Sequence, residues 1–159
     1  MQKTTAKVEH RDYIPWGWIA IPFCHVSFQG ADADAMKREW EKITSARFKQ
    51  YNTLVEEGEA RIESLNNKIK MIQDEIHKPW YRPWYNASEK AKLSQIGTIR
   101  KEIEQIELDN VENKKKRFYD SYECHRQVET FLNKNGFYLT HTSTSGDECK
   151  THTEIWTKD

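Results

Sequence analysis

The feature that most constrains this chain is a regular spacing of apolar residues between about residues 34 and 77. Side chains such as Ile62, Leu65, Ile69 and Ile72 recur at alternating intervals of three and four residues. Apolar residues at this spacing line one side of a helix, and a sustained heptad is typical of a coiled coil. The sequence therefore predicts one long amphipathic helix, whose apolar seam is interrupted at Gly58.

A second helix is predicted over residues 88–134. The two are separated by Pro79 and Pro83, which cannot both lie inside one ordinary helix. Asn86 with Glu89 three residues later is an amide version of a capping box, which marks a helix start. The short turn between the helices makes them antiparallel neighbours.

The apolar seams of the two predicted helices also match each other in register. If the helices pair in an antiparallel way about the turn, the sequence positions of the two residues in each facing pair add up to a nearly constant value. The expected pairs are Phe48 with Phe118, Gly58 with Ile106, Ile62 with Ile103, Leu65 with Ile99 and Ile69 with Ile96. We therefore expect an antiparallel coiled-coil hairpin with one small residue facing a large one.

Both ends of the chain carry the patterns of strands. Residues 13–29 are aromatic, β-branched and apolar at both odd and even positions, which is typical of a strand covered on both faces. Beyond Gly136, residues alternate with a period of two from Phe137 to Trp156, around a Thr-Ser-Gly-Asp turn, which predicts a β-hairpin. Residues 1–12 are polar, and we expect them to lack regular structure.

A helical hairpin brings the two ends of the chain together, so we expect these strands to form one small antiparallel sheet. The predicted fold class is α+β, mostly α, with the order β-α-α-β-β. It consists of a β head, residues 1–30 and 135–159, and a helical arm, residues 31–134, whose tip lies at 79–85.

Composition limits the function classes. The 159 residues include 25 Lys and Arg and 25 Asp and Glu, a net charge of zero, which argues against binding nucleic acid or anionic membrane by bulk charge. A basic run from Lys114 to Arg117 keeps nucleic acid as a minor alternative. No run of about 18 apolar residues or signal-peptide pattern occurs, and the odd count of three cysteines favours reduced thiols and a cytoplasmic location.

The aromatic tip is the candidate partner site. Trp80, Tyr81, Arg82, Trp84 and Tyr85 follow one another in a tandem Pro-Trp-Tyr repeat. Tryptophan, tyrosine and arginine are the residue types that dominate protein-binding hot spots, and exposed aromatic patches mark partner sites. The alternative is that the rings fold back and close the end of the helical hairpin.

The predicted topology also gathers thiols and imidazoles in the β head. They are Cys24, His25, Cys124, His125, His141, Cys149 and His152. These side chains are of the types that bind zinc, but no C-x-x-C spacing occurs, so the sequence assigns no metal ligand and no catalytic residue. Zinc, or acid–base chemistry by the same histidines with Asp32 or Asp34, stays open as an alternative.

The sequence thus favours a non-catalytic protein that binds a protein partner through its tip or head, as an adaptor or an inhibitor, without a cofactor. The exposed flanks of the helices favour a homodimer. Two alternatives remain: a small nucleic-acid-acting enzyme or zinc protein built on the histidines of the head, and an architectural protein that assembles only with itself.

Overall fold

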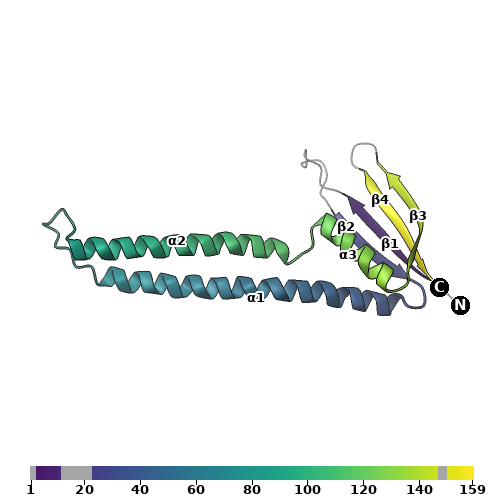
Figure 1. Ribbon diagram of the computed structural model, residues 1–159, viewed down its shortest axis with the longest axis horizontal. Coiled ribbons are helices and arrows are strands. Elements are labelled where there is room, and N and C mark those ends of the chain that lie inside the picture. Colours follow the sequence, from purple (N-terminus) through teal and green to yellow (C-terminus); the bar gives the residue numbers. More distant parts are fainter. Residues whose placement is uncertain (1–2, 12–22, 147–149) are drawn as a thin grey trace. The chain divides into compact units, whose positions relative to one another are not determined.

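The computed structural model describes residues 3–11, 23–146 and 150–159 (Figure 1). The elements are β1 (Thr4–Arg11), β2 (Phe23–Gln29), α1 (Ala33–Asp74), α2 (Ala87–Lys116), α3 (Ser121–Lys134), β3 (Tyr138–Ser145) and β4 (Thr151–Lys158). The α+β class, mostly α, is confirmed. The chain divides into two compact units: unit 1 is Met1–Phe48 with Phe118–Asp159, and unit 2 is Lys49–Arg117.

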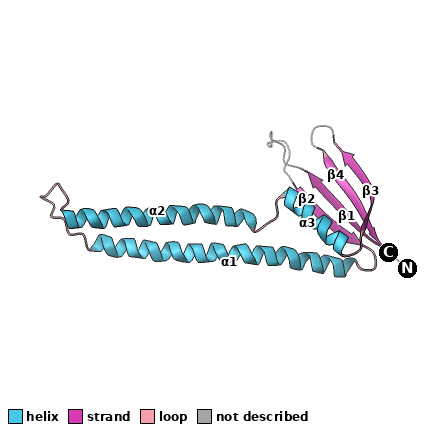
Figure 2. Cartoon of the chain, in the orientation of Figure 1, coloured by secondary structure: helices cyan, strands magenta, loops and turns pink. Residues whose placement is uncertain are grey.

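Unit 1 contains an antiparallel sheet with the strand order β2-β1-β4-β3 (Figure 2). The expectation that residues 1–12 lack regular structure is wrong, because β1 lies inside the sheet and pairs with both β2 and β4. Residues 23–29 form β2, as part of the predicted strand 13–29; residues 13–22 lie outside the described part of the chain. The described sheet has four strands instead of the expected three.

The pattern of β1 explains both its place and why it is hard to see in the sequence. Its residues alternate between one face that packs into the protein and one that is more open, but only Ala6 and Val8 on the inner face are apolar. Both are fully buried. Thr4 and His10 occupy the other two inner positions, so the apolar signal is only two residues long.

Helix α3 covers this inner face of the sheet, as Figure 1 shows. Val128 and Leu132 are fully buried against the strands. The rest of the core comes from Ala6, Val8, Met36, Phe131, Phe137 and Trp156, with Cys24, Val26, Phe28, Trp40 and Cys124 packed around it. The core of unit 1 thus joins the sheet, α3 and the first turns of α1.

The predicted single helix over residues 88–134 is wrong, because α2 ends at Lys116 and α3 begins at Ser121. Asp120 caps α3, and its side chain accepts a hydrogen bond from the backbone N–H of Glu123 at 2.7 Å. A capping carboxylate at this position starts a new helix. The separate helix α3 packs on the sheet.

In unit 2, the apolar seams of α1 and α2 pack together. The buried residues are Leu65, Ile69, Ile72, Ile96, Ile99 and Ile103, with Ile62, Ile76 and Ile106 partly buried beside them. The antiparallel helical pairing is confirmed, whereas its supercoiling as a coiled coil stays a prediction. No described helix has both the length and the apolar composition that crossing a membrane requires.

Asn110 is the nearest neighbour of Gly58, and the expected pairing with Ile106 stays a prediction. A Cβ atom at position 58 would lie 2.3 Å from Oδ1 and 2.9 Å from Cγ and Nδ2 of Asn110. Asn110 is buried. The small residue in α1 therefore leaves room for a polar side chain of α2.

Candidate functional site

The aromatic tip, residues 79–85, is held in a defined turn between α1 and α2. The backbone N–H of Arg82 donates to the carbonyl of Pro79 at 3.1 Å. At the start of α2, the predicted capping box is present: the Asn86 side chain accepts from the N–H of Glu89 at 2.8 Å, and Glu89 Oε1 accepts from the N–H of Asn86 at 2.9 Å. Local hydrogen bonds therefore fix the end of the tip.

Arg82 braces this turn from inside. Its guanidinium forms an ion pair with Glu89, and the side chains are only 18% and 9% exposed. The hydrogen bond from the Asn86 N–H and the charge of Arg82 hold the pKa of Glu89 below its ordinary value, against the opposing effect of burial. Glu89 thus joins the capping box to the ion pair.

The rings of the tip face solvent. Trp80 is 94% exposed, Tyr81 72%, Trp84 64% and Tyr85 39%. Trp80 and Tyr81 meet edge to face, with ring centroids 5.9 Å apart, and Lys78 Nζ lies 4.9 Å from the ring centroid of Tyr85. The rings of Trp80, Tyr81 and Trp84 therefore do not close over the end of the helical hairpin, whereas Tyr85 is more covered.

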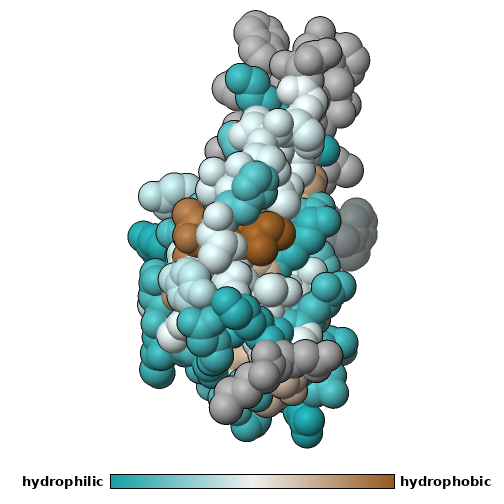
Figure 3. Space-filling model, turned by 90° about the vertical axis from the view of Figure 1, so that its right-hand side faces the viewer, coloured by the Kyte–Doolittle hydropathy of each residue, from teal (hydrophilic) through white to brown (hydrophobic). Residues whose placement is uncertain are grey.

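The tip also carries an excess of positive charge. Residues 77–92 contain four Lys or Arg and one Glu, a formal charge of +3, in a chain whose net charge is zero. The face seen in Figure 3, which does not include the tip, carries strongly apolar side chains only in small separate areas among hydrophilic ones. The tip therefore combines large exposed rings with cations.

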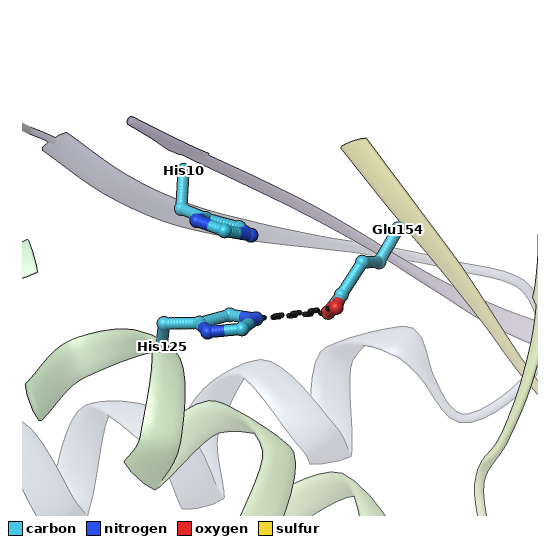
Figure 4. Close-up of side chains that lie close together, drawn as sticks. All are labelled: His10, His125 and Glu154. Atoms are coloured by element: carbon cyan, nitrogen blue, oxygen red, sulfur yellow. Dashed lines mark hydrogen bonds and ion pairs between the residues drawn. The ribbon is translucent and has the colours of Figure 1, made fainter. Parts of the chain in front are cut away.

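A second group of chemically active side chains lies in unit 1. His10 of β1, His125 of α3 and Glu154 of β4 point toward one another from the sheet and the helix that covers it (Figure 4). In the pairing of β1 with β4, Glu154 is opposite Val8 and His10 is opposite His152. The side chains of His10, His152 and Glu154 therefore share the inner face of the sheet, which α3 covers with His125. His10 and Glu154 are buried, and His125 is partly buried.

The contacts within this group are short. His125 Nε2 lies 3.0 and 3.1 Å from the two carboxylate oxygens of Glu154, and 3.1 Å from Oε1 of Glu129, one turn further along α3. The rings of His10 and His125 stack with centroids 3.8 Å apart, and His152 stacks on His10 at 5.1 Å. Two carboxylates and three imidazoles therefore meet at one end of the sheet.

The structure separates the histidines that the sequence grouped. His125 and His152 come together with His10, which sequence reasoning missed because β1 was not recognised. His25 and His141 are exposed and lie on the opposite face of the sheet. Inner and outer residues alternate along β1, and His10 is two residues after the buried Val8. This alternation is the sequence signal that could have placed His10 on the inner face.

The other candidates are placed as follows. Asp32 lies 3.8 Å from Lys158 Nζ, at the end of β4 away from His152, so it does not support acid–base chemistry with these histidines. Cys149 lies outside the described residues.

Cys24 and Cys124 are free thiols that face each other between β2 and α3. Cys124 Sγ lies 3.9 Å from the carbonyl oxygen of Cys24. Hydrogen bonding to Cys124, burial and the nearby charge of Glu154 raise the pKa of Cys24, whereas the hydrogen bond from Cys24 lowers the pKa of Cys124. The two thiols therefore differ in acidity although both are half-buried.

No family model, curated protein or solved structure matches this chain.

Proposed function

We propose that this protein is a non-catalytic binding protein that docks its aromatic tip on a folded protein partner. The partner surface has an apolar pocket for an indole ring and carboxylates around it. The observation that carries the proposal is Trp80, which is 94% exposed on a turn with defined hydrogen bonds. Occupying a partner surface in this way suits an adaptor or an inhibitor.

The size of the rings supports this role. A buried aromatic side chain covers about 150–250 Å², and apolar burial contributes about 25 cal/mol per Å². Covering Trp80 and Trp84 therefore offers several kcal/mol to set against the entropy lost on association. Exposed rings of this size, with tyrosines beside them, have the composition of a binding hot spot.

The organisation of the turn reduces the cost of binding. The capping box, the ion pair of Arg82 with Glu89 and the contact of Lys78 with Tyr85 exist before any partner is bound. A ring presented on such a turn loses less conformational freedom on docking than one on an unstructured loop. This is the arrangement expected of a surface selected for binding.

The positive charge of the tip indicates which kind of partner surface it can bind. The formal charge of +3 over residues 77–92 favours an acidic rim, which accelerates association and fixes orientation. Tryptophan, tyrosine and lysine also occur at membrane interfaces. We favour a protein, because the rings of Trp80 and Tyr81 are nearly perpendicular, at 82°, and the tip contains no aliphatic residue to enter the acyl region.

The experiment places a photocrosslinking phenylalanine derivative at position 80 and captures the partner from the cells that make the protein. Position 71 is the matched control, because Met71 is 67% exposed on α1 of the same unit. The captured partner is then purified and titrated with the original protein, with Trp80→Ala/Trp84→Ala and with Met71→Ala.

We expect the double variant to bind at least about 30-fold more weakly, the loss of roughly 2 kcal/mol. Met71→Ala should bind as the original does, and raised salt should weaken binding. Equal affinity for the double variant contradicts the proposal. So does tip-dependent binding only to vesicles containing 30% phosphatidylserine, or a tip-dependent dimer by light scattering without another partner.

A further inference from the structure

We propose that His10, His125 and Glu154 form a Zn²⁺ site. Glu129, which lies outside this group of three but contacts His125 Nε2, closes the fourth position. The site lies wholly within unit 1 and does not depend on the function proposed for the tip. Two imidazoles and carboxylate oxygens are donors that zinc accepts, and zinc sites in proteins are commonly four-coordinate and tetrahedral.

The positions of the donor atoms support this assignment. One ligand atom from each of His10, His125 and Glu154 lies within 4.8 Å of the others. Bonds of about 2.0–2.2 Å in a tetrahedral zinc site separate neighbouring ligand atoms by about 3.3–3.6 Å. His125 Nε2 and Glu154 Oε1 are already 3.0 Å apart, so these two ligand atoms are close to the separation that a zinc site requires.

The clustering of negative charge is the second observation. Glu154, from β4, and Glu129, from α3, both lie within 3.1 Å of the same atom, His125 Nε2. That nitrogen carries one hydrogen at most, so it can donate a well-aligned hydrogen bond to only one of the two carboxylates. Two carboxylates around one point repel each other unless a cation lies between them.

Charge balance favours a divalent ion. Glu154 is buried, and an uncompensated charge in such a position is costly. Zinc carries +2, the two carboxylates carry −2, and the histidines bind as neutral imidazoles, so the assembled site is neutral.

The stacked rings identify the movement that binding requires. The ring planes of His10 and His125 are only 23° from parallel. A nitrogen lone pair lies in the plane of its ring, so the lone pairs of the two stacked rings do not point at a common metal position. One imidazole has to turn about its Cβ–Cγ bond for both nitrogens to reach the ion. The rings therefore separate when zinc binds, and their NMR signals change together.

The nearby thiols are the main competitors for zinc. Cys24 is the register partner of His10 in β2, and Cys124 precedes His125 in α3. Neither belongs to the described group of converging ligand atoms, and, unlike Glu129, neither has a described contact with one of its nitrogen atoms. The proposed site therefore has nitrogen and oxygen ligands only, a property that distinguishes it from a Cys₂His₂ site.

The test removes metal with EDTA and titrates the full chain with Zn²⁺ against a chromogenic chelator. We expect one zinc per chain, about 100-fold weaker affinity in His125→Gln or Glu154→Gln, and about tenfold weaker affinity in Glu129→Gln. His141→Ala is the matched control, because His141 is exposed on the other face of the sheet, and its affinity should change less than twofold. Circular dichroism checks that each variant is folded.

Two further measurements distinguish zinc bound by histidine and carboxylate from zinc bound by the cysteines. Cys24→Ser/Cys124→Ser should retain one zinc, and X-ray absorption of the loaded protein should show nitrogen and oxygen neighbours without sulfur. Loss of zinc in the cysteine variant, a sulfur shell near 2.3 Å, equal loss in His141→Ala, or less than half an equivalent of bound zinc overturns the assignment.

Discussion

The guanidinium of Arg82 and the carboxylate of Glu89 meet behind the aromatic turn, and the same carboxylate oxygen accepts the backbone N–H of Asn86. One side chain of α2 therefore ties the turn to the helix start. In this position Arg82 supports the rings of the tip, of which Trp80 is the most exposed.

The first prediction concerns this support. Arg82→Ala should leave Glu89 partly buried without its cation, so the turn opens more often while α2 stays helical. Backbone amides of residues 80–89 should exchange with deuterium about tenfold faster. Arg100→Ala, an exposed change on α2, should not alter exchange in the tip. Unchanged exchange in Arg82→Ala would show that the ion pair does not hold the turn.

The second prediction is the pH dependence of the tip. Glu89 has a lowered pKa in the folded protein because of the Asn86 N–H and the charges of Arg82 and Lys78. A carboxyl group with a depressed folded pKa stabilises the fold above its unfolded pKa. It loses that contribution as pH falls from the ordinary value of 4.5 through the lower folded value. The tip should therefore loosen below about pH 4.5.

The indole N–H signal of Trp80 in ¹⁵N-labelled protein reports this change without the other tryptophans. We expect it to shift as Glu89 becomes protonated. In Glu89→Gln, which cannot titrate, the signal should stay nearly constant over the same pH range. An identical titration curve in both proteins would exclude Glu89 as its source.

The features predicted correctly from sequence are those fixed by neighbours in the chain. Asn86 and Glu89 are three residues apart, and both hydrogen bonds of a capping box follow from that spacing. The seam around Ile69 and Ile96 is equally local, because each helix shows its own periodicity and the short turn makes them antiparallel. Phe48 and Phe118 also meet as expected, with ring centroids 5.4 Å apart.

The features missed are those that depend on distant parts of the chain. The inner face of β1 has only two apolar residues, and its strand identity comes from pairing with β4 about 150 residues later. His10 was missed with it. The break before α3 was hidden because apolar residues continue at helical spacing past Phe118, although Asp120 caps a new helix that the sheet holds in place.

The third prediction uses two helical glycines. At Gly58, an added methyl group would collide with the carboxamide of buried Asn110, whereas at Gly97 it meets no atom within 4 Å. Alanine is favoured over glycine inside a helix by about 1 kcal/mol, and overpacking costs about 1–3 kcal/mol. Gly97→Ala should therefore stabilise the protein by roughly 0.5–1 kcal/mol, and Gly58→Ala should destabilise it by about 1 kcal/mol.

Urea unfolding of four proteins completes this test. In an Asn110→Ala background the collision is absent, so Gly58→Ala should become stabilising, and the double-mutant cycle should show a coupling energy of about 1–2 kcal/mol. If Gly58→Ala has the same effect with and without Asn110, the two residues do not share the space that the structure assigns to them.

The fourth prediction is the order in which the thiols ionise. The interaction with the Cys24 thiol lowers the pKa of Cys124, while the same interaction, burial and the charge of Glu154 raise the pKa of Cys24. As pH rises, Cys124 should therefore become a thiolate first. Because thiolates are the species that iodoacetamide attacks, Cys124 should be alkylated at a lower pH than Cys24.

The pH profile of alkylation, followed by peptide mass in EDTA-treated protein, separates acidity from accessibility. Cys24→Ala removes the interaction between the two thiols, so the apparent pKa of Cys124 should rise toward that of an ordinary thiol. Cys124→Ala should lower the apparent pKa of Cys24, because the neighbouring sulfur no longer holds its proton. If each profile is unaffected by loss of the other cysteine, the two thiols are independent, and the packing of β2 against α3 has to differ from the one described.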